Sequence, residues 1–197
     1  MIVRRFFVMV FAATLLVGAC GGDPPPPPPP PQPDADSLAA YNDSVAAAAA
    51  ERRAEAERVA AEREAEAASQ RAMRAARATL EEMVFFDYDM SEIRDDAQTA
   101  LRAKVDILRA SPQVQIRIEG HADDRGSTEY NMALGNRRAE AIRQFLTGFG
   151  LAENRFEIVS FGEGRPLQQG STDSAWARNR RGQFVITAGA NAINPAN

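Results

Sequence analysis

The sequence predicts an α/β (α+β) fold: a two-layer domain with elements in the order β-α-β-α-β-β, preceded by a long helical stalk. Two observations predict the domain. Apolar and polar residues alternate over 114–120, as in a half-buried strand, and segments with one apolar helical face lie on either side of it. The stalk is predicted because residues 37–80 are dominated by alanine, glutamate and arginine and contain no glycine or proline.

The expected domain, residues 81–188, is long enough to enclose one hydrophobic core. Its expected elements are strands at 84–86, 114–120, 156–161 and 183–187, helices at 92–110 and 128–149, and a flexible tail at 189–197. Pro112 should end the first helix and Gly150 the second. Strand–helix–strand connections imply parallel neighbours, whereas the last two strands allow an antiparallel pair.

Residues 1–19 have the features of a bacterial secretory signal peptide. Two arginines precede an apolar stretch over 6–17 that is too short to span a bilayer, and small residues lead to Cys20. That ending resembles the lipobox of bacterial lipoproteins, in which the cysteine is lipidated after cleavage. We expect lipidation at Cys20 and, because Gly21 follows it, a protein anchored in the cell outer membrane and facing the periplasm. The alternative is an ordinary secreted protein with one unpaired cysteine.

A proline-rich linker, residues 20–36, follows this cysteine. The unbroken prolines of 24–31 should form a polyproline II spacer of roughly 25 Å, although a ligand for a PxxP-binding domain has the same pattern. The stalk would reach roughly 65 Å as a helix. Apolar residues recur at one of its heptad positions, but Arg52 and Glu66 interrupt the series. A single solvated helix is therefore favoured over self-association.

The composition excludes several classes of partner and cofactor. The formal net charge is -4, and about -6 once Arg4 and Arg5 are removed with the signal peptide, which argues against nucleic acid. Cys20 is the only cysteine and His121 the only histidine. The domain therefore lacks the usual zinc ligands, and we expect neither a metal nor a cofactor.

One charged residue falls on an apolar helix face. On a helical wheel of 128–149, Arg138 lies within the apolar stripe, whereas Arg137 points away from it. A guanidinium in that position needs a partner, and Asp123, between the strand and this helix, is the nearest candidate. Two interpretations remain open: a structural Arg138–Asp123 bridge, or a site in which Arg138 binds a ligand carboxylate and Asp123 a ligand ammonium.

The domain closely resembles the OmpA-like peptidoglycan-binding domain family from about 84 to 186. The matching segments are VFFDYD (84–89), EGHADDRG (119–126), EYN (129–131), LG (134–135), RRA (137–139), SFG (160–162) with Pro166, and NRR (179–181). Their order and spacing make the resemblance specific. The lipobox is an independent match to the lipid-anchored members of that family.

The resemblance implies a non-catalytic domain that binds the diaminopimelate of the peptidoglycan stem peptide. The family's acidic and basic ligand contacts fall on Asp123 and Arg138, and its helix asparagine on Asn131. Its aromatic–aspartate pair falls on Tyr88 and Asp89, with Phe86 and Asp87 as the alternative.

The function implied is non-covalent tethering of the outer membrane to peptidoglycan, with TolB and other Tol components as further candidate partners in envelope integrity and cell division. Two alternatives differ in class. One is a lipoprotein that uses the same domain in an assembly or secretion machine. The other is a peptidoglycan hydrolase, for which Asp87, Asp89 and Asp123 would supply the carboxylates.

Overall fold

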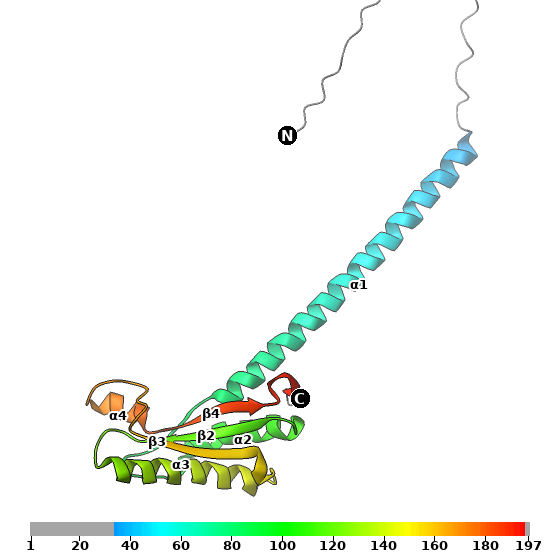
Figure 1. The fold of residues 1–197 in the computed structure, drawn as a ribbon. Helices are drawn as coiled ribbons and strands as arrows, with labels where there is room; N and C mark the ends of the chain where they lie inside the picture. Colours follow the sequence, from blue (N-terminus) through cyan, green and yellow to red (C-terminus); the bar gives the residue numbers. More distant parts are fainter. Residues whose placement is uncertain (1–33, 196–197) are drawn as a thin grey trace, which may run out of the picture. The chain divides into compact units, whose positions relative to one another are not determined.

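The structure, a computed structural model, describes residues 34–195 (Figure 1). Its elements are α1 (Ala35–Glu81), β1 (Val84–Phe85), α2 (Asp95–Ala110), β2 (Gln115–His121), α3 (Thr128–Gly148), β3 (Phe156–Gly162), α4 (Asp173–Asn179) and β4 (Arg181–Ala188), with 3-10 turns at Glu153–Arg155 and Ala190–Ala192. The predicted signal peptide, Cys20 and the proline run 24–31 lie outside the described residues. Within 34–195, no helix is both long and apolar enough to cross a membrane.

The four strands form one sheet in the order β1-β4-β2-β3. β2 and β3 are parallel, as the helix between them predicts, and β4 is antiparallel to both β1 and β2. The sequence allowed an antiparallel pair between the last two strands, but β4 does not pair with β3, because β2 lies between them. β4 inserts between β1 and β2, so β1 and β2 run in the same direction without touching, and the fold class is the predicted one.

The core lies between the sheet and the helices α2 and α3. Its buried members include Leu101, Val105 and Leu108 from α2, and Ile142 and Leu146 from α3. These residues recur every three or four positions and so share one helical face. Ile116 and Ile118 of β2 alternate with polar residues, as predicted, and pack against that layer.

The last turns of α1 belong to the folded domain. Leu80 is fully buried and Ala76 nearly so, both within the core. The ammonium of Lys104, buried in α2, donates to the carbonyl oxygens of Thr79 (2.5 Å), Leu80 (3.3 Å) and Glu82 (2.7 Å). A cation on the otherwise unpaired carbonyls at a helix C-terminus is favourable, so Lys104 caps α1.

Three features of the structure differ from the sequence-based expectation: the start of one helix, an additional short helix and the order of the C-terminal segment. The first domain helix begins at Asp95 rather than 92, because the backbone of Arg94 is extended (ψ 158°). The short helix α4 separates β3 from β4. The segment from Gly189 is held rather than loose up to Asn194, since Ile193 is buried in the core and Asn194 exchanges hydrogen bonds with Ser111.

Candidate ligand-binding site

The candidate site lies where β2 ends and α3 begins, and a pair of glycines brings these two elements together. A Cβ placed on Gly120 of β2 would lie 1.8 Å from the carbonyl oxygen of Gly135 in α3, so only glycine allows this approach. Asp123 and Arg138 each follow three residues after one of these glycines. The close contact therefore brings both charged residues to one end of the domain.

A small pocket of about 100 Å³ opens at this place. Its lining residues are Tyr88, Asp89, Asp123, Arg125, Gly126, Tyr130, Asn131, Leu134 and Arg138. The structure thus brings together all five residues that the sequence singled out for binding. The volume is below the roughly 300–1,000 Å³ of sites for drug-sized ligands, so it suits an end group rather than a whole molecule.

Arg138 lies at the base of the pocket and is 0% exposed. It donates to three backbone carbonyls: Nε to Met90 (2.8 Å), Nη1 to His121 (2.8 Å) and Nη2 to Asp87 (3.1 Å). Burial lowers its pKa to about 10, although Asp123 opposes the shift, so it stays cationic at neutral pH. Three of the five guanidinium N–H donors are used, which leaves two for a ligand.

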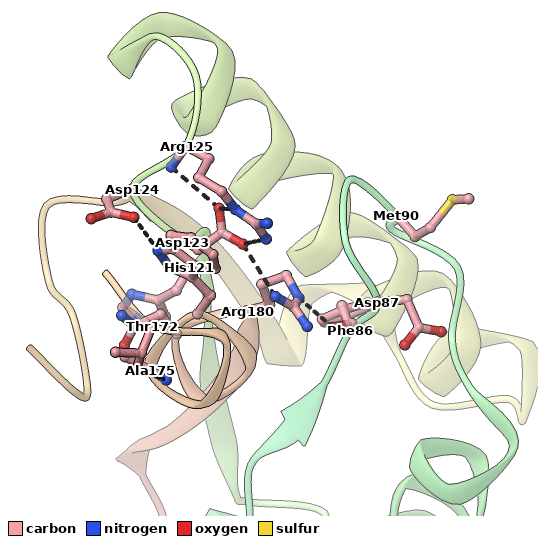
Figure 2. A network of polar contacts seen from close by, with 12 residues as sticks. Phe86, Asp87, Met90, His121, Asp123, Asp124, Arg125, Thr172, Ala175 and Arg180 are labelled. Carbon is pink, nitrogen blue, oxygen red and sulfur yellow. Dashed lines mark hydrogen bonds and ion pairs between the residues drawn. The ribbon is translucent and has the colours of Figure 1, made fainter. Parts of the chain in front are cut away.

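The direct Arg138–Asp123 bridge, one of the two interpretations left open, is not formed. Asp123, 4% exposed, pairs instead with Arg125 at 2.6 Å and Arg180 at 3.2 Å (Figure 2). Burial alone would raise the pKa of Asp123, but hydrogen bonds from Arg125 and Arg180 outweigh it and hold that pKa below its usual value. Three backbone carbonyls accept hydrogen bonds from Arg138 in place of the Asp123 carboxylate.

The other predicted residues surround these two. The buried amide of Asn131 donates to the carbonyl of Arg125 at 3.2 Å and to the carboxylate of Glu163, so it braces the loop. Asp89 has a left-handed backbone (φ 57°), which aspartate tolerates, and accepts a hydrogen bond from the hydroxyl of Tyr130. Tyr88 is 57% exposed at the rim.

The structure distinguishes between Asp87 and Asp89 by position. Asp89 lines the pocket beside Asp123, whereas the carboxylate of Asp87 turns to Arg94 at 3.1 Å. Only the backbone carbonyl of Asp87 takes part in the site, through Arg138. The aromatic–aspartate pair that meets the pocket is therefore Tyr88 and Asp89.

Arg125 and Arg180 are site residues that the sequence did not single out. The Arg125 guanidinium lies between two rings, 4.0 Å from the centre of Tyr88 and 4.1 Å from that of Trp176. The indole of Trp176 also donates to Asp124 at 2.5 Å. Arg125 belongs to the recognised EGHADDRG segment, but its ring partners lie in distant parts of the chain, so periodicity could not reveal its position.

His121 and the NRR segment lie next to the site without lining the pocket. His121 is buried, stacks on Phe161 and does not line the pocket. Arg180 joins two segments, because its Nε donates to the carbonyl of Phe86 at 3.0 Å while Nη1 bonds Asp123 (Figure 2). Asn179 fixes the backbone of 167 and 168. The NRR segment therefore braces the loops around the site.

The pocket combines donors and acceptors suited to a zwitterion. Arg138 has spare N–H groups for a carboxylate, and Asp123 and Asp89 are acceptors for an ammonium. Over residues 34–195, no group of three or more histidine, cysteine, aspartate or glutamate side chains could hold a metal ion.

Comparison with known proteins gives consistent matches to one family. The model of the OmpA family matches residues 85–180. A Brucella melitensis protein named peptidoglycan-associated lipoprotein is 47% identical over 105 residues, which cover 53% of this chain and 62% of that protein. A Pseudomonas aeruginosa protein of the same name is 42% identical over 97 residues, covering 49% and 57%. The match thus spans less than two thirds of these relatives' length.

A solved structure matches more completely. The crystal structure of the peptidoglycan-associated lipoprotein from Burkholderia pseudomallei is 39% identical, with a TM-score of 0.52, and the match covers 53% of this chain and 89% of that one. The residues 85–180 that the family model matches contain the loop of Asp123 and the helix of Arg138.

Proposed function

Since this chain belongs to the OmpA family, we propose that it binds the peptidoglycan stem peptide and tethers the outer membrane to the cell wall. The observation that carries the proposal is the pocket that joins Asp123, Asp89 and Arg138. A free diaminopimelate centre presents one carboxylate and one ammonium. Arg138 would take the carboxylate and the two aspartates the ammonium.

The geometry supports an end-group ligand of this kind. The pocket holds about 100 Å³, which leaves the glycan and the rest of the stem outside. Tyr88 and Tyr130 are exposed at its edge and offer ring surface to those parts.

A sacculus pulldown tests the proposal. Purified wild-type protein should co-sediment with peptidoglycan sacculi, Asp123→Ala should not, and Arg137→Ala should co-sediment like wild type. Arg137 is the matched control because it neighbours Arg138 but is exposed. Sedimentation of a folded Asp123→Ala variant at the wild-type level would refute the assignment.

We infer that the domain binds without cleaving. Members of the family that the sequence resembles are non-catalytic, and Asp123 is held ionised by two arginines, which does not suit a general acid. Pure protein incubated with sacculi should release no soluble muropeptides. Release that Asp123→Ala abolishes would make the protein a hydrolase.

The lipid anchor and the Tol partnership extend the proposal to the whole protein. Lipidation at Cys20 would place the domain in the periplasm, and the relatives' name refers to a lipoprotein. Recovery of TolB with the full chain after crosslinking in cells would support a Tol-linked role. Recovery of secretion-machine components in its place would favour the assembly alternative.

A further inference from the structure

We propose that Arg125 is a gate for the ligand amine: its side chain occupies the carboxylate of Asp123 and must release it before a ligand ammonium can bind. The inference rests on the proposed function, because it concerns the same pocket and the same end group. It adds Arg125 as a residue that competes with the ligand ammonium for the carboxylate of Asp123.

The first step of the argument is the hydrogen-bonding capacity of Asp123. A carboxylate has two oxygens with about four lone-pair positions. Oδ1 accepts from the backbone N–H of Arg125 at 3.3 Å and from its Nε at 3.2 Å. Oδ2 accepts from Nη2 of Arg125 at 2.6 Å and from Nη1 of Arg180 at 3.2 Å. Protein donors therefore fill all four positions, and an ammonium must replace one of them.

The second step identifies the donor that leaves. The Arg180 side chain is 15% exposed and is also bonded to the carbonyl of Phe86, so moving it would strand a backbone acceptor. The Arg125 side chain is 31% exposed and has no hydrogen-bond acceptor besides Asp123 in the described part of the chain. Figure 2 shows both arginines reaching the same carboxylate from different segments. Arg125 is the one that can leave at lower cost.

The third step concerns the two rings that hold Arg125. Tyr88 comes from the loop after β1 and Trp176 from α4, and the guanidinium lies about equally far from both ring centres, at 4.0 and 4.1 Å. A cation keeps its attraction to a ring as it moves across the face. The guanidinium can therefore withdraw from Asp123 while it remains between the rings.

A gate of this kind lowers the affinity for some ligands more than for others. Competition by Arg125 lowers the apparent affinity for any amine by the fraction of time that Asp123 is free. A zwitterion can also bind the spare N–H groups of Arg138, so it overcomes the competition, whereas a simple amine has no second contact. The proposed pocket should thus prefer amino-acid end groups over lone amines.

Calorimetry with a synthetic diaminopimelate-containing stem tripeptide tests the gate on the purified full chain. Arg125→Gln should bind roughly two- to fivefold more tightly than wild type, the range that removal of a partly exposed ion pair suggests. Arg125→Lys should lie between the two, because an ammonium cannot fork the carboxylate. Arg137→Gln is the matched control and should bind like wild type.

Fluorescence gives a second readout, because Trp176 is the only tryptophan in the chain. The tripeptide should change Trp176 emission in wild type and in Arg137→Gln, but much less in Arg125→Gln, in which no guanidinium moves against the indole. Thermal melts establish that each variant is folded.

The outcomes separate the gate from the proposed function. If wild type binds the tripeptide but Arg125→Gln binds equally well or more weakly, Arg125 is a spectator or a direct ligand contact, and the gate is wrong. If wild type binds nothing, the proposed function fails and the gate falls with it. Tighter binding by Arg125→Gln, together with loss of the tripeptide-induced change in Trp176 emission, supports both the gate and the proposed function.

Discussion

Asp123 and Arg138 are the residues on which binding should depend. Asp123→Ala should cost about 2–5 kcal/mol of affinity for stem peptide, because the ammonium that it would accept is left unpaired. Arg138→Lys should bind stem peptide more weakly than wild type. A lysine has only three N–H donors, so it cannot donate to three carbonyls and also form two hydrogen bonds with a ligand carboxylate. Isothermal calorimetry on folded variants measures both losses.

The exposed neighbour Arg137 provides the control for this pair. It stacks loosely on Tyr130, at 5.6 Å, and does not line the pocket. Arg137→Ala should therefore bind nearly as wild type does. Equal losses at positions 137 and 138 would contradict the role assigned to Arg138.

His121 should make the domain less stable in weak acid. Burial, with the charges of Arg181 and Arg165, lowers its pKa from 6.5 to about 4, and the carboxylate of Glu119 at 3.9 Å does not offset this. The unfolded chain takes up a proton near pH 6.5, whereas the folded chain does so only near pH 4. Stability is thus full above pH 6.5 and falls by about 3 kcal/mol as the pH drops to 4.

Urea unfolding from about pH 7 down to about pH 4.5 measures this effect. His121 is the only histidine, so His121→Gln should remove the histidine contribution in that window even if it lowers stability overall. The same pH slope in His121→Gln would show that other groups cause it.

At this scale, sequence reasoning located the principal residues but not all their partners. The helical wheel predicted that Arg138 is buried and Arg137 exposed, because both follow from local periodicity. It assigned Arg138 a carboxylate partner, but three backbone carbonyls satisfy it instead. Two of these come from the loop after β1, whose path depends on the tertiary fold.

Among the elements, those with long periodic patterns were the most predictable. The alternation in β2 and the apolar face of α3 fixed their positions within one residue of the observed bounds. The short helix α4 was not among the expected elements, because seven residues show too little periodicity. The place of β4 between β1 and β2 depends on long-range pairing, which no local pattern encodes.

The helix α1 provides a prediction that separates spacer from binder. Removing residues 51–66, about four turns, leaves Ala76, Leu80 and their core contacts intact. The shortened protein should therefore bind sacculi in solution as wild type does, but should tether the envelope less well in cells, as seen by increased outer-membrane blebbing or leakage. Loss of sacculus binding in solution would mean that this part of α1 takes part in recognition.

For the whole molecule, the proposed lipidation of Cys20 would decide where the domain acts. Cys20→Ser removes the only thiol that could be acylated, so the protein should no longer incorporate radiolabelled palmitate or fractionate with the outer membrane. The Cys20→Ser protein should still bind sacculi in solution, because the residues proposed for binding differ from the residue proposed for anchoring. Lipid labelling of Cys20→Ser would contradict the lipobox assignment.

The cap that Lys104 places on α1 has a mechanical consequence. In a tether, tension enters the domain through the end of α1, and there it meets three hydrogen bonds to one ammonium beside the buried side chain of Leu80. Lys104→Met should therefore lower the rupture force in single-molecule pulling from the N-terminal side while leaving stem-peptide affinity unchanged. An undiminished rupture force would show that Leu80 and its neighbours alone resist the pull. If the rupture force falls, Lys104 sets the load at which the proposed link between membrane and wall would give way.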